Sequence, residues 1–319
     1  MTDSQLELIN IPDVVMNEIL EYLDFPEILK LRKVCHYFKD FIDEVKSKSI
    51  LKDINIIFYP KEIRFDLFSV QNERYVILYE KFQANGCRVS QNGREKILEN
   101  SDFREIFIRD LEILLKLQKS IFRVFRLIRR DQNDFDYFLE NFPKTPELKI
   151  QEFYMDAGDD AQNEISKILG FLNSKFLISL SFHPYGGRKV LNLSEISKMD
   201  HWKNAEQLYV NRNIFVILDV LKLEHFSLVE VKMDRLRGKE LLELREMLLN
   251  RLEFAEFNFD YVNFDDEKEF SDFLGPDSMT FFQMKSSEDV LRITHNSEVY
   301  SVNFKRIRKE NVPEGFSIY

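Results

Sequence analysis

The chain has 319 residues, with 45 Lys and Arg against 55 Asp and Glu, a formal net charge of −10. This acidic balance argues against a nucleic-acid partner, because phosphate contacts require clustered cations. Only 9 Gly and 8 Pro occur, which argues against disorder and against a turn-rich sandwich or barrel. The 30 Phe predict a core and interfaces built from rigid aromatic side chains.

The chain lacks the sequence features of secreted and membrane proteins. Its two cysteines, Cys35 and Cys87, are far apart and offer no framework of paired cysteines. Residues 1–10 have no basic segment followed by an apolar one, as a secretory signal would. No apolar run approaches the roughly 18 residues of a membrane span. We therefore expect a cytoplasmic or nuclear protein, or both, with no membrane partner.

Apolar residues recur at helical spacing from Ile11 to Asp43, where Pro12 and Pro26 each open a helical stretch. The pattern predicts three short helices, whose apolar positions are Val15, Met16, Ile19, Leu20 and Leu23, then Ile28, Leu29 and Leu31, then Val34, Cys35, Phe38, Phe41, Ile42 and Val45. Three such helices cannot enclose this much apolar surface among themselves. They are therefore expected to pack against a partner.

The same segment resembles an F-box. Its run Ile-Pro-Asp-Val-Val-Met-Asn-Glu-Ile-Leu-Glu-Tyr-Leu (11–23) and its continuation from Pro26 to Phe38 follow the family pattern without a gap. Ile11 replaces the usual opening Leu, and Phe38 stands where Trp is common. The resemblance implies docking on the Skp adaptor of a cullin–RING ubiquitin ligase. The residues that it assigns to this docking are Ile11, Pro12, Val15, Ile19, Leu20, Leu23, Ile28, Leu29 and Val34.

After Ile50 the apolar pattern changes to strand spacing. Residues 54–59, 63–68 and 75–79 are rich in β-branched and aromatic side chains and predict an antiparallel meander. Asn85-Gly86 marks a turn, and helical spacing returns at residues 103–116. The expected buried stripe of this helix is Phe107, Leu111, Leu114 and Leu115.

Beyond Ser120 the chain shows a loose internal period of strand and helix. Strands are expected to begin near Phe122, Ile150, Ile178, Gln207, Leu228 and Phe254. Helical runs are expected between them, at 135–142, 161–172, 194–202, 214–223 and 239–249. This spacing is typical of a leucine-rich-repeat-like stack with parallel strands, although the asparagine ladder of true leucine-rich repeats is missing. Residues 290–293 and 299–304 predict a closing hairpin.

This second half resembles the FTH domain of the nematode-expanded F-box A proteins. The similarity lies in Ile196–Leu208, which contains His-Trp-Lys-Asn-Ala, and in His225-Phe226 followed by Val229-Glu-Val-Lys232. Phe273-Leu-Gly-Pro276 and Asn303-Phe-Lys-Arg-Ile307 resemble the closing stretch of that domain. His201 replaces a usual Gln.

No catalytic motif is found. The chain has no phosphate-binding glycine loop, no dinucleotide fingerprint and no metal-spaced pair among its five histidines. We expect no enzyme activity, cofactor or metal. The basic runs at Arg123–Arg130 and Lys305–Lys309 are interpreted as solvated faces, and Trp202 as a core residue.

The sequence thus predicts an α+β to α/β chain: an F-box at 8–50, strands and a helix at 51–118, and an FTH-like repeat domain at 119–319. The predicted function is that of a substrate-recruiting adaptor that binds the Skp adaptor and an unknown protein substrate. Two alternatives stay open. One is a standalone repeat scaffold capped by the N-terminal helices. The other is a hydrolase or nucleotide-binding protein, which the missing motifs disfavour.

Overall fold

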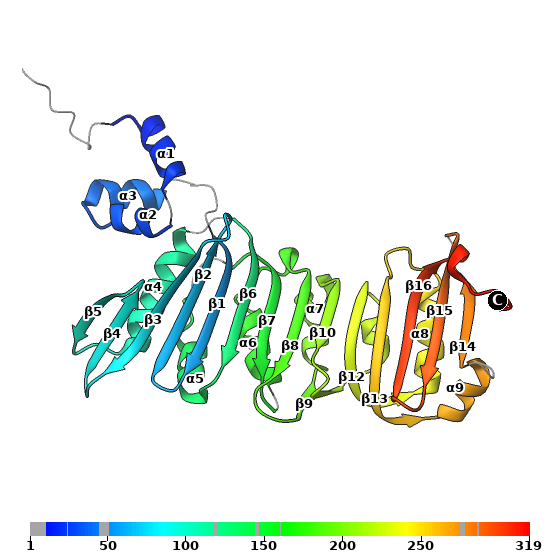
Figure 1. The fold of residues 1–319 in the computed structure, drawn as a ribbon. Helices are drawn as coiled ribbons and strands as arrows, with labels where there is room; N and C mark the ends of the chain where they lie inside the picture. The colour runs from blue at the N-terminus through cyan, green and yellow to red at the C-terminus, as the bar shows by residue number, and fades with distance from the viewer. Residues whose placement is uncertain are drawn as a thin grey trace, which may run out of the picture. The chain divides into compact units, whose positions relative to one another are not determined.

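The computed structural model describes residues 11–23, 25–44, 51–117, 120–143, 147–159, 161–274, 278–285 and 287–319. The chain divides into two units, residues 1–151 (unit 1) and 152–319 (unit 2). Short N-terminal helices precede a sheet region in which parallel and antiparallel strand pairs alternate with helices (Figure 1). The expectation of a mixed α and β protein is therefore confirmed.

Unit 1 begins with three short helices, as the sequence predicts: α1 (Asp13–Tyr22), α2 (Phe25–Leu31) and α3 (His36–Glu44). Pro12 occupies the N-cap position of α1, and its carbonyl accepts hydrogen bonds from the amides of Val15 and Met16. The Arg32 guanidinium donates to both carboxylate oxygens of Asp43, at 2.7 and 2.8 Å. This paired contact ties the end of α2 to α3.

The sheet of unit 1 is an antiparallel meander joined to one parallel strand. Its strands are β1 (Leu51–Tyr59), β2 (Glu62–Ser69), β3 (Arg74–Phe82), β4 (Gly86–Gln91), β5 (Arg94–Glu99) and β6 (Phe122–Arg129). The spatial order is β6-β1-β2-β3-β4-β5, and only the β1–β6 pair is parallel. The predicted meander is confirmed in β1 to β3. Strands β4 and β5 were not predicted, because their many polar residues hide the strand spacing.

One face of this sheet is covered by α4 (Phe103–Leu117) and α5 (Gln132–Asn141). The predicted stripe of α4 is confirmed, because Phe107, Leu111, Leu114 and Leu115 are all buried. The Phe107 ring lies 5.5 Å from the rings of both Phe65 and Tyr79 and meets them edge to face. Edge-to-face contacts of this kind add to the free energy gained from burial alone. The abundance of Phe thus builds the core that the composition predicts.

Unit 2 contains a run of parallel strands, entered through β7 (Ile150–Ala157). The others are β8 (Ser179–Pro184), β10 (Gln207–Val210), β12 (Leu228–Arg237) and β13 (Glu256–Asp265). Each is parallel to the next in this order. The helices α6 (Gln162–Leu169), α7 (Asp200–Asn204) and α8 (Gly238–Leu248) lie between them in the chain, with short 3-10 turns at η2 (Ser174–Phe176), η3 (Ile196–Lys198) and η4 (Val220–Leu223).

The expected helix at 214–223 is wrong. The segment instead forms strand β11 (Ile214–Ile217) followed by the 3-10 turn η4. Three of the four residues of β11 are β-branched, which favours a pleated strand over a helix. Asp219 then accepts a hydrogen bond from the Leu221 amide and starts the 3-10 turn. Strand β11 pairs with β12 and with the short strand β9 (Lys189–Asn192).

Unit 2 closes with antiparallel strands. β13 pairs with β16 (Ser301–Arg308), β16 with β15 (Asp289–Asn296), and β15 with β14 (Met279–Gln283), after helix α9 (Glu267–Leu274). The predicted hairpin is confirmed in β15 and β16. The last residue, Tyr319, exchanges backbone hydrogen bonds with Phe281 and Gln283 of β14, at 2.9 and 2.7 Å. The 3-10 turn η5 (Lys309–Asn311) precedes this segment.

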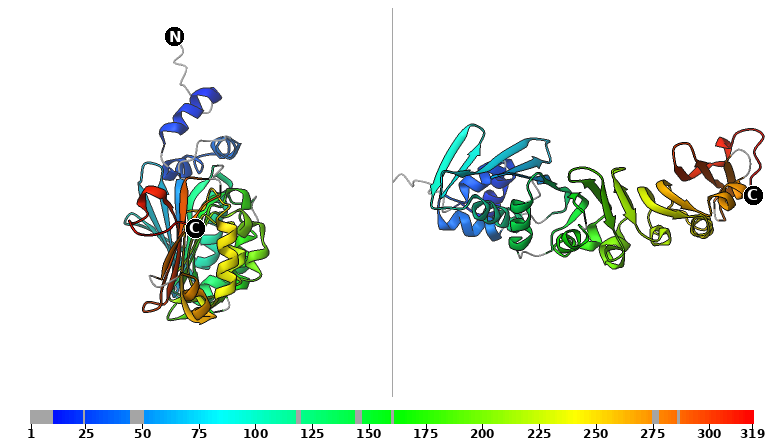
Figure 2. Two further views of the ribbon diagram at one scale, coloured as in Figure 1. Left: turned by 90° about the vertical axis from the view of Figure 1, so that its right-hand side faces the viewer. Right: turned by 90° about the horizontal axis from the view of Figure 1, so that it is seen from below.

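Helices α4 and α5 in unit 1, and helices α6, α7 and α8 in unit 2, lie on one face of the strands of their unit and leave the other face without a helix (Figure 2). Buried and accessible residues alternate along the strands in agreement with this arrangement, as strand β12 shows. Val229, Val231 and Met233 are buried on the helix side, whereas Glu230 and Lys232 between them are partly exposed on the opposite side. The helix-free face is therefore polar and accessible at alternate positions.

Candidate partner-docking surfaces

The F-box helices enclose a small core of five buried side chains: Met16, Leu20, Ile28, Phe38 and Ile42. Partly buried residues complete it, among them Ile11, Leu23, Cys35 and Leu117 of α4. Full burial of an aliphatic side chain of this size stabilises the fold by about 1.5–3 kcal/mol. Five such residues make a core that holds the helices in place but leaves much apolar surface outside it.

Helix α1 carries a second apolar stripe beside the buried one. Pro12, Val15, Ile19 and Tyr22 follow one another at helical spacing, so they share a face of the helix. Pro12 is exposed, Val15 is 43% exposed, Tyr22 is 89% exposed, and Ile19 is partly buried. A helix that is apolar on two adjoining stripes, only one of which meets its own core, presents the other to a partner. This group is called the α1 stripe below.

The nine residues predicted to dock the Skp adaptor fall into three groups. Exposed residues are Pro12, Val15 and Val34, the last 67% exposed, and partly buried ones are Ile11, Ile19, Leu23 and Leu29. Leu20 and Ile28 lie in the F-box core, at 2% and 4% exposure. With the helices packed in this way, both support the surface from beneath.

Two exposed apolar residues of α1 are absent from that set. Val14 is 71% exposed and Tyr22 is 89% exposed. The sequence could have identified Tyr22 as part of this surface, because Tyr22 lies seven residues after Val15 and therefore on the same face of the helix. Val14 lies off both stripes and follows no period that a sequence reading could detect.

In unit 2, three side chains bind backbone carbonyls in or just after the preceding helix or 3-10 turn. His201 Nε2 lies 2.8 Å from the Leu172 carbonyl, and His225 Nε2 lies 2.7 Å from the Trp202 carbonyl. Arg251 donates to the carbonyls of His225 and Phe226, at 2.8 and 2.7 Å. A carbonyl only accepts, so Nε2 of each histidine carries the proton. His201, His225 and Arg251 are called the carbonyl ladder below.

Burial lowers the pKa of His225, and the nearby charge of Arg251 lowers it further, against the opposing effect of the Trp202 carbonyl. The neutral tautomer with a proton on Nε2 is thereby favoured. The ladder thus links successive strand–helix units, and at His225 the lowered pKa favours an uncharged imidazole.

The motifs that resemble the FTH domain lie along this ladder. The Trp202 ring is 1% exposed and meets the Phe226 ring edge to face at 4.9 Å. Its indole N–H donates to the Lys222 carbonyl at 3.0 Å. Trp202 is therefore a core residue, as predicted, and His201-Trp202 and His225-Phe226 hold the fold together.

The helix-free face of unit 2 combines aromatic and acidic groups. The rings of Tyr154 and His183 are stacked, with centroids 4.2 Å apart. Tyr209 lies near Glu152 and Glu230. Burial is the main cause that raises the pKa of Tyr209, and the negative charges of these two carboxylates raise it further. A phenol carries its proton at neutral pH, so Tyr209 is available as a hydrogen-bond donor.

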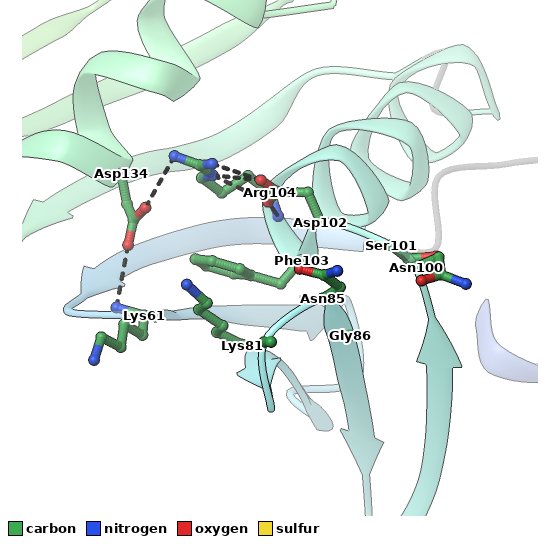
Figure 3. Close-up of a pocket in the computed structure, with 11 residues that line it drawn as sticks. Lys61, Lys81, Asn85, Gly86, Asn100, Ser101, Asp102, Phe103, Arg104 and Asp134 are labelled. Atoms are coloured by element: carbon green, nitrogen blue, oxygen red, sulfur yellow. Dashed lines mark hydrogen bonds and ion pairs between the residues drawn. The ribbon is translucent and has the colours of Figure 1, made fainter.

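Unit 1 contains a polar cavity of about 450 Å³ beside the first turn of α4 (Figure 3). Its walls include Lys61, Lys81, Asn85, Asn100 and Ser101, and the Asp102–Arg104 pair. Arg104 donates to both oxygens of Asp102, and these bonds lower the pKa of that carboxyl against the effect of burial.

A second acid, Asp134, accepts the backbone N–H of Lys61 at 3.2 Å, and burial raises its pKa. The cavity lining therefore includes Arg104, which pairs with Asp102 and lies 3.8 Å from the Asp134 carboxylate, together with two exposed lysines. In the figure the labelled acids face Arg104 and the Lys61 backbone, and the lining contains no cysteine or histidine.

Among the residues that the structure describes, no group of three or more His, Cys, Asp or Glu side chains comes together in a way that could hold a metal ion. Within the same residues, none of the helices has the length and apolar character needed to span a bilayer.

The chain matches two family models, the F-box domain at residues 8–50 and the FTH domain at residues 132–277. It is also similar to F-box A protein 224 of Caenorhabditis elegans, with 24% identity over 288 residues. That alignment covers 85% of this chain and 70% of the relative. No solved structure matches. The chain is an F-box protein of the nematode F-box A type, with an N-terminal F-box followed by an FTH domain.

Proposed function

We propose that this chain is the substrate-recruiting adaptor subunit of a Skp–cullin–F-box ubiquitin ligase. The F-box binds the Skp adaptor, and the FTH region holds a protein substrate close to the ubiquitin-charged enzyme. The reaction is then accelerated by proximity, because holding two reactants together removes much of the entropic cost of their meeting. The chain itself supplies no bond-making residue.

The observation that carries this proposal is the α1 stripe. An F-box that served only as a cap on its own chain would bury its apolar residues against that chain. Instead Val15 and Tyr22 are exposed while Met16 and Leu20, on the adjoining stripe, are buried. Tyr is one of the residue types enriched in binding hot spots, and apolar neighbours such as Val15 extend the accessible apolar surface around it.

The strand–helix units from β6 onward are proposed to act as a leucine-rich-repeat-like array that presents the substrate surface. The parallel register from β7 to β13 and the carbonyl ladder support this organisation. In such arrays each unit is covered by its neighbours, and exposed strand positions form the binding surface.

The test is the affinity of the purified full-length chain for the Skp adaptor, measured by biolayer interferometry. Val15→Asp and Tyr22→Asp each place a charge on the α1 stripe and should weaken binding by about 30-fold or more, the scale of a hot-spot loss. Both variants should keep the wild-type circular dichroism spectrum and melting temperature, because their side chains are exposed.

Val70→Asp is the matched control. Val70 is 49% exposed in the turn after β2, against 43% for Val15, so both substitutions place the same charge at similarly exposed positions. The control should bind like the wild type. The proposal fails if the wild type does not bind the Skp adaptor, or if the two α1 variants bind as tightly as Val70→Asp.

A further inference from the structure

A cluster of exposed apolar side chains on the helix-free face of unit 2 has no part in the fold described above. Val190 of β9, Ile217 of β11 and Val262 of β13 are 42%, 45% and 46% exposed. Phe215 of β11 lies opposite Val190 in one strand pair and opposite Lys232 in the other. These four apolar residues are called the Phe215 patch below. Apolar groups that gather on one exposed face mark interaction sites more often than scattered ones do.

Two cations lie against the ring at the centre of this patch. The Arg188 guanidinium is 5.9 Å from the Phe215 centroid, and the Lys232 ammonium is 5.3 Å from it. Cation–ring contacts at this distance are favourable and hold the charged groups beside the apolar surface. An aromatic ring between two cations is thus displayed on a chain whose net charge is −10.

Neither cation is neutralised within the part of the chain that the structure describes, where no carboxylate lies within 4.0 Å of Arg188 or Lys232. Asp260 is the acid opposite Lys232 in the strand register, but it is 3.2 Å from Arg212 instead. The two cations therefore remain available to an acidic partner.

We propose that the Phe215 patch binds an acidic polypeptide segment that carries apolar anchor side chains. The inference rests on the proposed adaptor function and specifies the chemistry of its substrate. Apolar anchors of the segment would cover Val190, Phe215 and Ile217, and its carboxylates would pair with Arg188 and Lys232. Aliphatic neighbours and only two unpaired cations favour a polypeptide over a nucleic acid, whose affinity depends on many phosphate contacts.

The probe is a phage-displayed library of random peptides, selected on the immobilised full-length chain. The enriched peptides are then synthesised, and their affinities are measured by fluorescence anisotropy. Two variants test the patch: Phe215→Ala removes the ring, and Arg188→Glu with Lys232→Glu reverses both charges. The second variant keeps the ring, so it decides the question if Phe215→Ala melts at a lower temperature.

The matched control is Lys167→Glu with Lys239→Glu. Both lysines are exposed on helices α6 and α8, on the opposite side from the patch, and the change in net charge is the same. We expect enriched peptides rich in Asp or Glu together with Leu, Ile, Val or Phe. Their affinity should fall at least about tenfold on the patch variants, stay unchanged on the control, and weaken as salt screens the charges.

The proposal is overturned if the enriched peptides bind the patch variants and the control equally, or if they are predominantly basic. It is also overturned if a single-stranded oligonucleotide binds more tightly than the peptides and depends on the same residues. Skp binding by the patch variants, measured in parallel, should match the wild type. If the wild type does not bind the Skp adaptor, the adaptor function is refuted, whatever the peptide measurements show.

Discussion

Replacing Trp202 by Phe tests whether the carbonyl ladder region stabilises unit 2. The substitution removes the indole N–H, so the Lys222 carbonyl loses its 3.0 Å hydrogen bond. Loss of one partly buried hydrogen bond costs about 1 kcal/mol. The smaller ring also leaves a void against Phe226, at a cost of about 1–2 kcal/mol more for the lost ring atoms. The free energy of unfolding should therefore fall by about 2–3 kcal/mol.

For a unit of this size, each kcal/mol corresponds to about 2–4 °C in melting temperature. The transition of unit 2 should then move down by about 4–12 °C. Circular dichroism is the suitable signal, because the variant has lost the only tryptophan of the chain. Leu252→Ala serves as the control, since Leu252 is 54% exposed and its truncation should change stability by less than about 0.5 kcal/mol. A Trp202→Phe variant that melts with the control would refute the assigned role of the indole.

Three other properties can be measured on the same chain. Burial lowers the pKa of His295, so the folded chain favours the neutral imidazole. The neutral imidazole therefore stabilises the fold fully at a pH above about 6.5, the pKa of histidine in the unfolded chain, and this stabilisation is lost as the pH falls toward the lower pKa of the folded chain. The melting temperature should therefore fall between about pH 7.5 and 5.5, and it should fall less steeply in the His295→Asn variant. A variant whose melting temperature depends on pH as steeply as that of the wild type would contradict this role of His295. Burial raises the pKa of Cys87 to about 11, so a thiol reagent should modify the partly exposed Cys35 quickly and Cys87 only on unfolding, as mass spectrometry would show. Asp66 is buried and accepts from Arg64 and Arg74 at 2.9 and 2.7 Å. Asp66→Ala should therefore lower the melting temperature of unit 1, by an amount equivalent to about 1–3 kcal/mol, and a melt equal to that of the wild type would refute the pairing.

The sequence predicted best those elements whose burial follows one clear period. The α4 stripe at Phe107, Leu111 and Leu114 and the strands at Phe122, Gln207 and Leu228 are such cases. The strands β4 and β5 were missed because their residues are mostly polar. Strand β11 was interpreted as part of a helix because its apolar run continues into Val220, Leu221 and Leu223, where the helical and strand periods cannot be separated.

The candidate site was predictable only in part. The F-box pattern pointed to residues 11–38 as the candidate docking region, but it could not separate Leu20 in the core from Val15 on the surface, since both are apolar and lie on adjoining stripes. The Phe215 patch could not be found from the sequence at all. Its residues come from three strands that are distant in the chain, and only the sheet register brings Val190, Phe215 and Lys232 into one row.

The alternation along β12 and β13 has a consequence for how such proteins can diversify. Over most of these strands every second residue is buried on the helix side, and the residues between them lie on the accessible face, where Glu230 and Asp260 pair with Arg212. Substitutions at the outward positions change what the face recognises while the inward positions keep the scaffold stable. New specificities can therefore arise by point mutation on one side of the sheet without a compensating change in the interior. Duplicated copies of such a gene could acquire different targets while sharing one architecture.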